Sequence, residues 1–220
     1  MTTVADLPRI ALAQMEICPG RPDLNVLRME KLIAQARGAG VELVAFPELC
    51  ISGYILGDLW EVDAVVEDWA AYSDRLCAAS AGLTLIFGNV VCDRQGIGQD
   101  GRLRKINAVR VCHDGAWVDR PGLPPGLCAG CQPKTVQPNY RFFDDDRHFV
   151  STRLLAQEQG RSVYDWAIPF DVPRRGGGTF RFGTQLCEDI WCQDYCWDGA
   201  VLDTMACYAR AGAQAVFNLS

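Results

Sequence analysis

Runs of apolar residues alternate along this chain with segments whose apolar residues recur every three or four positions. Such runs are typical of buried strands, and the periodic segments are typical of amphipathic helices. The pattern predicts strands over 10–17, 41–46 and 83–91, with the first covered on both faces, and helices over 25–38 and 63–80. Asp23 or Asn25 is expected to cap the first helix. This alternation indicates an α/β protein.

The second half of the chain departs from this rhythm. Residues 107–119 predict two antiparallel strands with a turn at His113-Asp114-Gly115, and the proline-rich segment 120–139 predicts a loop. The pattern then predicts a strand that ends at Cys187, a helix over 199–212 and a strand over 214–219. An α/β domain rarely closes directly on a buried strand. We therefore expect residues 1–220 to form a single domain that is truncated at its C-terminal end.

Composition and charge narrow the classes of function. Of the 220 residues, 49% are hydrophobic and 22% are charged, as in a protein with one sizeable core. The net charge of -6 and the scattered Lys and Arg residues argue against a nucleic-acid or anionic-membrane partner. The 11 cysteines, an odd number in a long chain, fit a disulfide scaffold poorly. We therefore expect a cytoplasmic protein that acts on a small molecule.

Three reactive side chains lie where predicted elements end, which is where sheet proteins present their ligands. Glu48 follows the strand in LVAFP, Lys134 lies in the proline-rich loop, and Cys187 follows the strand TFRFGTQL. Taken singly, none is specific, because such acids and lysines are usually solvated and cysteine is often a small buried hydrophobe.

Taken together, the segments around these residues are far more specific. AFPELCISGY around Glu48, KTVQPNYRFFDDDRHF from Lys134 and LCEDIW around Cys187 resemble, in this order, the nitrilase superfamily of carbon-nitrogen hydrolases. Within it they are most similar to the glutaminase domains of glutamine-dependent NAD synthetases, and the final NLS is similar as well. The resemblance implies a nitrilase-type four-layer α-β-β-α sandwich and a catalytic triad of Glu48, Lys134 and Cys187.

The resemblance also implies the reaction, which is hydrolysis of the L-glutamine side-chain amide to glutamate and ammonia through a Cys187 thioester. Glu48 would transfer protons, while Lys134 and the N–H of Glu188 would stabilise the oxyanion. This step needs no cofactor. The ammonia would pass to a synthetase domain, absent from this chain, that uses ATP and Mg²⁺ to form NAD from deamido-NAD. Members of this family usually form homo-oligomers.

Four further residues carry over from the family to substrate binding. Tyr140, Glu188 and Trp191 fall where the family lines its glutamine pocket, with Glu188 suited to the substrate ammonium. For Tyr140 and Trp191, packing in the core or at a rim is the alternative. Asp145 occupies the position of a second active-site glutamate and is shorter by a methylene. A different nitrilase-type amidase or carbamoylase is the alternative function.

The remaining cysteines suggest a competing chemistry. Cys128 and Cys131 form a C-x-x-C pair, and Cys192 and Cys196 form a C-x-x-x-C pair. Two such pairs would make a zinc or iron-sulfur site if the fold brought them together. The second pair lies in an acidic, aromatic stretch without turn glycines, so we predict no metal site. The alternative outside enzymes is a non-catalytic protein, in which these pairs serve only structure or metal storage.

Overall fold

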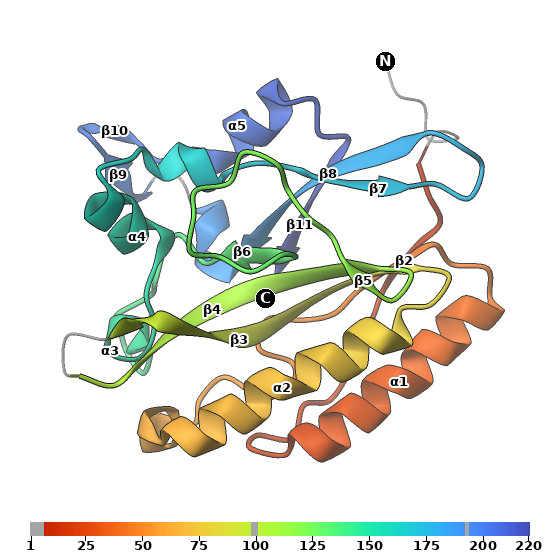
Figure 1. Cartoon of the computed structure of the whole chain (residues 1–220), viewed down its shortest axis with the longest axis horizontal. Coiled ribbons are helices and arrows are strands. Elements are labelled where there is room, and N and C mark those ends of the chain that lie inside the picture. Colours follow the sequence, from red (N-terminus) through yellow and green to blue (C-terminus); the bar gives the residue numbers. More distant parts are fainter. Residues whose placement is uncertain (1–6, 98–100, 192–193) are drawn as a thin grey trace.

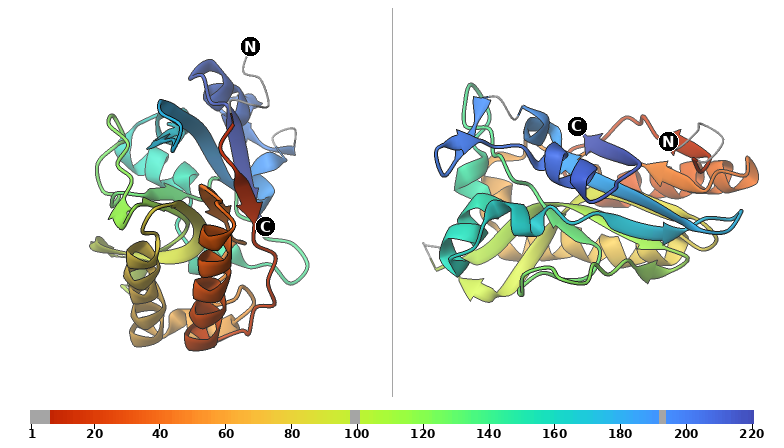
Figure 2. Two further views of the ribbon diagram at one scale, coloured as in Figure 1. Left: turned by 90° about the vertical axis from the view of Figure 1, so that its right-hand side faces the viewer. Right: turned by 90° about the horizontal axis from the view of Figure 1, so that it is seen from above.

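Two β-sheets lie face to face between helices, giving the predicted four layers in the order α-β-β-α (Figure 1). The structure is a computed structural model that describes residues 7–97, 101–191 and 194–220. Helices α1 (Pro22–Gly38) and α2 (Asp63–Ala79) cover the outer face of the first sheet. Helix α5 (Thr204–Arg210) lies on the outer face of the second sheet, as the turned views confirm (Figure 2).

The first sheet combines parallel and antiparallel pairing. Its strands are β1 (Ile10–Leu12), β2 (Leu43–Ala45), β3 (Thr84–Ile97), β4 (Leu103–His113), β5 (Ala116–Trp117) and β6 (Cys131–Pro133). Strands β1, β2 and β3 are parallel, whereas β3, β4 and β5 run antiparallel to one another and β6 pairs with β4. The predicted turn at 113–115 is confirmed, because β4 and β5 pair directly across it.

The second sheet has three strands, β7 (Phe170–Pro173), β8 (Thr179–Leu186) and β11 (Ala215–Leu219). Central strand β8 is antiparallel to β7 and parallel to β11. The connecting segments hold helices α3 (Asp145–His148) and α4 (Thr152–Gln159), the 3-10 turns η2 (Gly57–Glu61), η3 (Val163–Trp166) and η4 (Cys187–Ile190), and the hairpin of β9 (Cys196–Trp197) and β10 (Ala200–Val201). Strand β8 therefore ends at Cys187, as predicted.

The main core fills the space between the two sheets. Along β8, Phe180 and Phe182 point inward while Arg181 points out and pairs with Asp171, as the two-residue period of a strand requires. Their rings meet buried aliphatic side chains of the first sheet, among them Ile86. Full burial of each such side chain contributes about 1.5–3 kcal/mol. A second core lies between the first sheet and helices α1 and α2.

Two N-terminal predictions were wrong. Strand β1 lies at the edge of the first sheet, beside β2. Leu12 is 71% exposed, so the strand is not covered on both faces. Helix α1 begins at Pro22, so neither Asp23 nor Asn25 caps it. The buried Asn25 side chain instead bonds both backbone groups of Cys18. Pro at the first helical position favours this start, because its missing N–H has no helical partner there.

Two C-terminal boundaries also differ from the sequence pattern. The segment 120–139 is not entirely loop, since Cys131–Pro133 pairs with β4 as strand β6. The helix predicted over 199–212 is shorter and spans Thr204–Arg210, because Asp203 caps it by accepting the Ala206 N–H at 2.9 Å. Among the helices of the described residues, none is long and apolar enough to span a bilayer.

Candidate active site

Glu48 lies just beyond the C-terminal end of β2, and its side chain is buried. Strand β3 passes close to it, and the Gly88 N–H donates to the Pro47 carbonyl at 3.1 Å. A Cβ atom at position 88 would lie 2.6 Å from the Glu48 Cα and 2.5 Å from the Leu49 nitrogen. Only glycine therefore permits this close approach of two backbone segments.

We expect Gly88→Ala to displace Glu48 and to lower the free energy of unfolding by about 1–3 kcal/mol, because the added methyl meets rigid backbone. Chemical denaturation measures this loss. Gly38→Ala is the matched control, since a Cβ at Gly38 meets no atom within 4 Å. Equal stability of the Gly88→Ala and wild-type proteins would contradict the expected clash.

Lys134 follows strand β6 directly, and its side chain is fully buried instead of solvated. Its backbone N–H donates to the Asn107 carbonyl at 2.9 Å. Its Nζ donates to Glu48 Oε1 at 2.7 Å, to the Tyr54 hydroxyl at 2.9 Å and to Asp145 Oδ2 at 3.1 Å. Burial by itself would lower the pKa of Lys134, but the two carboxylates outweigh it and raise the pKa. Lys134 therefore carries a stable positive charge.

Two side chains that the sequence did not single out complete this buried cluster. The Tyr54 hydroxyl lies 2.6 and 2.8 Å from the two carboxylate oxygens of Asp145, and the Asn107 side-chain amide donates to Glu48 Oε1 at 2.7 Å. Tyr54 is the last residue of the segment AFPELCISGY, so its place in that motif could have identified it as a site residue. Nothing in the sequence around Asn107, which lies within a strand, indicates a role in the site. Asp145 reaches Lys134 despite its shorter side chain.

Opposing effects act on the pKa of Glu48. Burial raises its pKa, while the charge of Lys134 and the hydrogen bonds from Lys134 and Asn107 lower it, and the net pKa is raised. A carboxyl group with a raised pKa takes up and releases a proton more readily near neutral pH than an ordinary glutamate does.

Cys187 stands where β8 turns into η4, with a φ of 40°. A positive φ is a strained conformation for a residue with a side chain and is typical of functional sites. The Asn218 amide of the neighbouring strand β11 donates to the Cys187 carbonyl at 3.1 Å and so holds this turn. The pKa of the half-buried thiol is raised by burial and by Glu48 and is lowered by a hydrogen bond with Ser220 and by Lys134. Glu48, Lys134 and Cys187 therefore share one electrostatic neighbourhood.

Asp189 ties the Lys134 segment to the Cys187 turn, and the sequence analysis assigned it no role. Its buried carboxylate accepts the N–H groups of Thr135 and Val136 at 2.9 and 2.7 Å and that of Leu186 at 3.0 Å. Burial raises the pKa of Asp189 to about 7, and these backbone donors oppose that rise. The acid therefore links two segments that lie more than 50 residues apart in the sequence.

The residues predicted to bind substrate separate into two groups. Glu188 is buried beside Cys187 and accepts the Tyr140 hydroxyl at 3.1 Å and the Tyr195 hydroxyl at 2.7 Å. Tyr195 was not predicted, and it lies beyond the recognised motif. Trp191 instead directly follows η4 with 57% of its surface exposed, so the structure does not bring it into the buried cluster.

Within the part of the chain that the structure describes, no group of three or more His, Cys, Asp or Glu side chains is placed to hold an ion. Cys192 lies outside the described residues, so the pair Cys192 and Cys196 is not placed. Cys128 and Cys131 lie beside Arg110.

The sequence of this chain is similar to those of known proteins. The family model "Carbon-nitrogen hydrolase" matches residues 9–98. Glutamine-dependent NAD(+) synthetase of Xylella fastidiosa is 26% identical over 197 residues, which cover 86% of this chain and 28% of that protein. The synthetase of Thermotoga maritima is 24% identical over 185 residues, which cover 83% of this chain and 26% of that protein. The chain thus spans less than a third of the length of these curated relatives.

Solved structures agree on the fold. A glutamine-dependent NAD+ synthetase from Acinetobacter baumannii, solved with ADP, superposes with a TM-score of 0.63 at 23% identity and covers 97% of this chain and 32% of that one. An amidase from Nesterenkonia sp. gives a TM-score of 0.62 at 17% identity, covering 96% of this chain and 64% of that one. Family model, curated relatives and fold together confirm the resemblance: residues 9–98 match the carbon-nitrogen hydrolase family, and the chain has the fold shared by these NAD+ synthetase and amidase structures.

Proposed function

We propose that this chain hydrolyses the side-chain amide of L-glutamine to glutamate and ammonia, with Glu48, Lys134 and Cys187 as its catalytic residues and 1–220 as one hydrolase domain. The observation that carries the proposal is the buried Glu48–Lys134 ion pair, whose charges act on the thiol of Cys187, a cysteine in strained backbone conformation. Its three side chains follow strands β2, β6 and β8, so both sheets contribute to one site.

In the first half-reaction the Cys187 thiol must lose a proton, because its pKa is raised and the thiolate is the nucleophile. Glu48 accepts this proton, and the sulfur attacks the amide carbon. The resulting oxyanion is stabilised by the Lys134 ammonium and by the backbone N–H of Glu188, and each such donor contributes about 2.7–4 kcal/mol. Glu48 then returns the proton to the leaving nitrogen, and ammonia departs.

In the second half-reaction a water molecule attacks the thioester carbon of the acyl-enzyme. Glu48 accepts a proton from this water, the same donors stabilise the second oxyanion, and the proton returns to the Cys187 sulfur as glutamate leaves. Lys134 keeps its charge throughout, because two carboxylates hold its proton. Asp145 and Tyr54 fix its position through the short contacts with its Nζ.

Glutamine is the proposed substrate because an acidic group lies directly after the nucleophile. The buried Glu188 is positioned by the hydroxyls of Tyr140 and Tyr195 and offers negative charge to a substrate ammonium. Asp145, which contacts Lys134, is proposed as a further substrate-binding residue. Trp191 is assigned to the exposed rim of the pocket. The names of the curated relatives support this substrate.

We further propose that the ammonia supplies NAD synthesis from deamido-NAD in a cytoplasmic protein with a synthetase domain, where ATP and Mg²⁺ act at that domain. The relatives named as NAD synthetases support this, as does the ADP bound to one of them. In this proposal the three catalytic residues of the hydrolase step come from this chain, and the step uses no cofactor.

The test measures hydrolysis of two classes of substrate and, separately, the covalent labelling of cysteine. Purified protein is incubated with L-glutamine or with a carbamoyl amino acid, and ammonia and glutamate are measured. A glutamine-like diazoketone is expected to alkylate Cys187 much faster than Cys196, an exposed thiol that serves as the internal reference. Hydrolysis of the carbamoyl compound without reaction at glutamine would favour the carbamoylase alternative.

We expect Glu48→Gln to slow ammonia release by about 10²–10⁴-fold, because the amide keeps the shape of the side chain but cannot accept the proton. In the wild type, activity should fall as the pH drops below the raised pKa of Glu48, since only the ionised form is a base. Glu61→Gln is the matched control, as Glu61 also pairs with a mostly buried lysine, Lys105. A Glu48→Gln enzyme with wild-type turnover would contradict the assignment.

A further inference from the structure

A second reactive cysteine environment lies away from the Cys187 site, at the C-x-x-C segment of residues 128–131. Ala129 and Gly130 form a turn that joins Cys128 to Cys131, the first residue of β6. Gly130 has a φ of 70°, and a Cβ there would lie 2.4 Å from the Val111 carbonyl oxygen. The turn therefore requires glycine and is fixed against strand β4.

The two thiols of this pair differ in access. Cys128 is exposed, whereas Cys131, in strand β6 of the first sheet, is completely buried. The turn brings the two side chains close enough for each thiol to shift the pKa of the other. One thiol can thus meet a reagent from solvent, and the other is in position to react with it afterwards.

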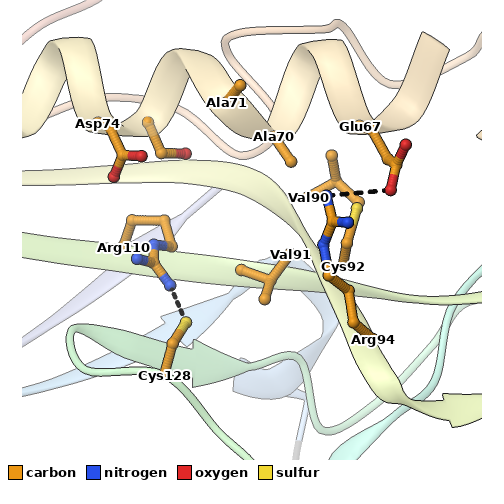
Figure 3. A pocket seen from close by; sticks show the side chains of 11 residues that line it. Glu67, Ala70, Ala71, Asp74, Val90, Val91, Cys92, Arg94, Arg110 and Cys128 are labelled. Carbon is orange, nitrogen blue, oxygen red and sulfur yellow. Dashed lines mark hydrogen bonds and ion pairs between the residues drawn. The ribbon is translucent and has the colours of Figure 1, made fainter. Parts of the chain in front are cut away.

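A buried cation completes the arrangement. Arg110 on β4 stacks over the Trp117 ring, with its Cζ 4.0 Å from the ring centroid, and its Nη1 lies 2.6 Å from the Cys128 sulfur. Figure 3 shows this contact at the edge of a pocket of about 280 Å³, which Asp74 and Cys92 also line. The pocket offers room for a small reagent to approach the Cys128 sulfur.

The charges favour a thiolate at one position of the pair. The hydrogen bond from Cys131, followed by the charge and hydrogen bond of Arg110, lowers the pKa of Cys128 to about 5 against the opposing effect of burial. The pKa of Cys131 is raised, first by its hydrogen bond to Cys128 and then by burial. At neutral pH Cys128 is therefore a thiolate and Cys131 a thiol, which is the division of roles found in reactive C-x-x-C pairs.

We propose that Cys128 and Cys131 form a dithiol site that hydroperoxides oxidise to a reversible disulfide, independently of the Cys187 chemistry. The Cys128 thiolate attacks one peroxide oxygen, the O–O bond breaks, and the leaving oxygen takes a proton to become water or an alcohol. Cys128 is then a sulfenic acid. The Cys131 sulfur attacks the Cys128 sulfur, the S–O bond breaks, and the Cys131 proton leaves with the hydroxyl as water. Two thiols are oxidised, and one hydroperoxide is reduced.

The test uses the full chain and hydrogen peroxide. Mass spectrometry of tryptic peptides is expected to show loss of two hydrogen masses, localised by fragmentation to Cys128 and Cys131, at least about tenfold faster than any modification of Cys196. Cys131→Ser should stop the reaction at a Cys128 sulfenic acid that a cyclic 1,3-dione traps. Cys128→Ser should abolish oxidation of Cys131, because Cys131 is buried.

The pair Cys77 and Cys112 is the internal control, because these two thiols also shift each other's pKa but both are buried. It should stay reduced during the same exposure. The pH dependence of Cys128 alkylation in the wild-type protein completes the test. The alkylation rate should be half-maximal near pH 5 and not near 9.0, the ordinary pKa of a cysteine thiol. Oxidation of Cys128 no faster than Cys196, or an alkylation midpoint near 9, would overturn the proposal.

Discussion

Replacing Cys187 by alanine is expected to reduce ammonia release from glutamine by at least about 10³-fold, the scale of loss when a catalytic nucleophile is removed. No other group at the site can take over, because Glu48 and Lys134 are held in a mutual ion pair. Diazoketone labelling should disappear in the same variant. The labelling needs only the first chemical step, so it reports on Cys187 even where turnover is slow.

Cys18→Ala is the matched control for this loss. Cys18 lies in the loop before α1, and it is partly buried, as Cys187 is. The control should keep both ammonia release and labelling. Undiminished glutaminase activity in Cys187→Ala would exclude the thioester mechanism, whereas lost turnover with retained labelling elsewhere would place the nucleophile at a different thiol.

Replacing Lys134 by alanine is expected to abolish activity and to lower the free energy of unfolding by about 3–5 kcal/mol, because it leaves two buried carboxylates without their cation. The pKa of Glu48, already raised by burial, should then rise further in the folded protein. The folded variant would bind more protons than the unfolded chain below that value. Its deficit relative to the wild type should therefore shrink as the pH is lowered from about 8 toward about 5.

Chemical denaturation at several pH values measures this effect, with Lys105→Ala as the matched control. Lys105 is also buried, and its Nζ donates to the Trp60 carbonyl at 2.6 Å and to Glu61 at 3.1 Å. The control should lose stability but keep diazoketone labelling of Cys187. A Lys134→Ala protein as stable as the wild type, or one that still labels normally, would contradict the structural and electrostatic roles assigned to Lys134.

Local patterns predicted most of the fold correctly. Helix α2 and strands β8 and β11 lie within a residue or two of their predicted limits, because each has a clear apolar period and a distinct end. Errors arose where pairing decided the outcome. Strand β6 is only three residues long and contains a proline, so nothing in its sequence distinguishes it from loop until β4 lies beside it.

The candidate site divides in the same way. The sequence by itself determined the chemical types and order of Glu48, Lys134 and Cys187, and their motifs identified the superfamily, because those motifs are continuous in the chain. Tertiary structure alone decided that Lys134 is buried, that Asn107 and Asp189 support the site, and that Arg110 lies beside Cys128. These contacts join residues far apart in sequence, and burial sets the charge states of the groups. Local sequence propensity carries no information about long-range contacts or about burial.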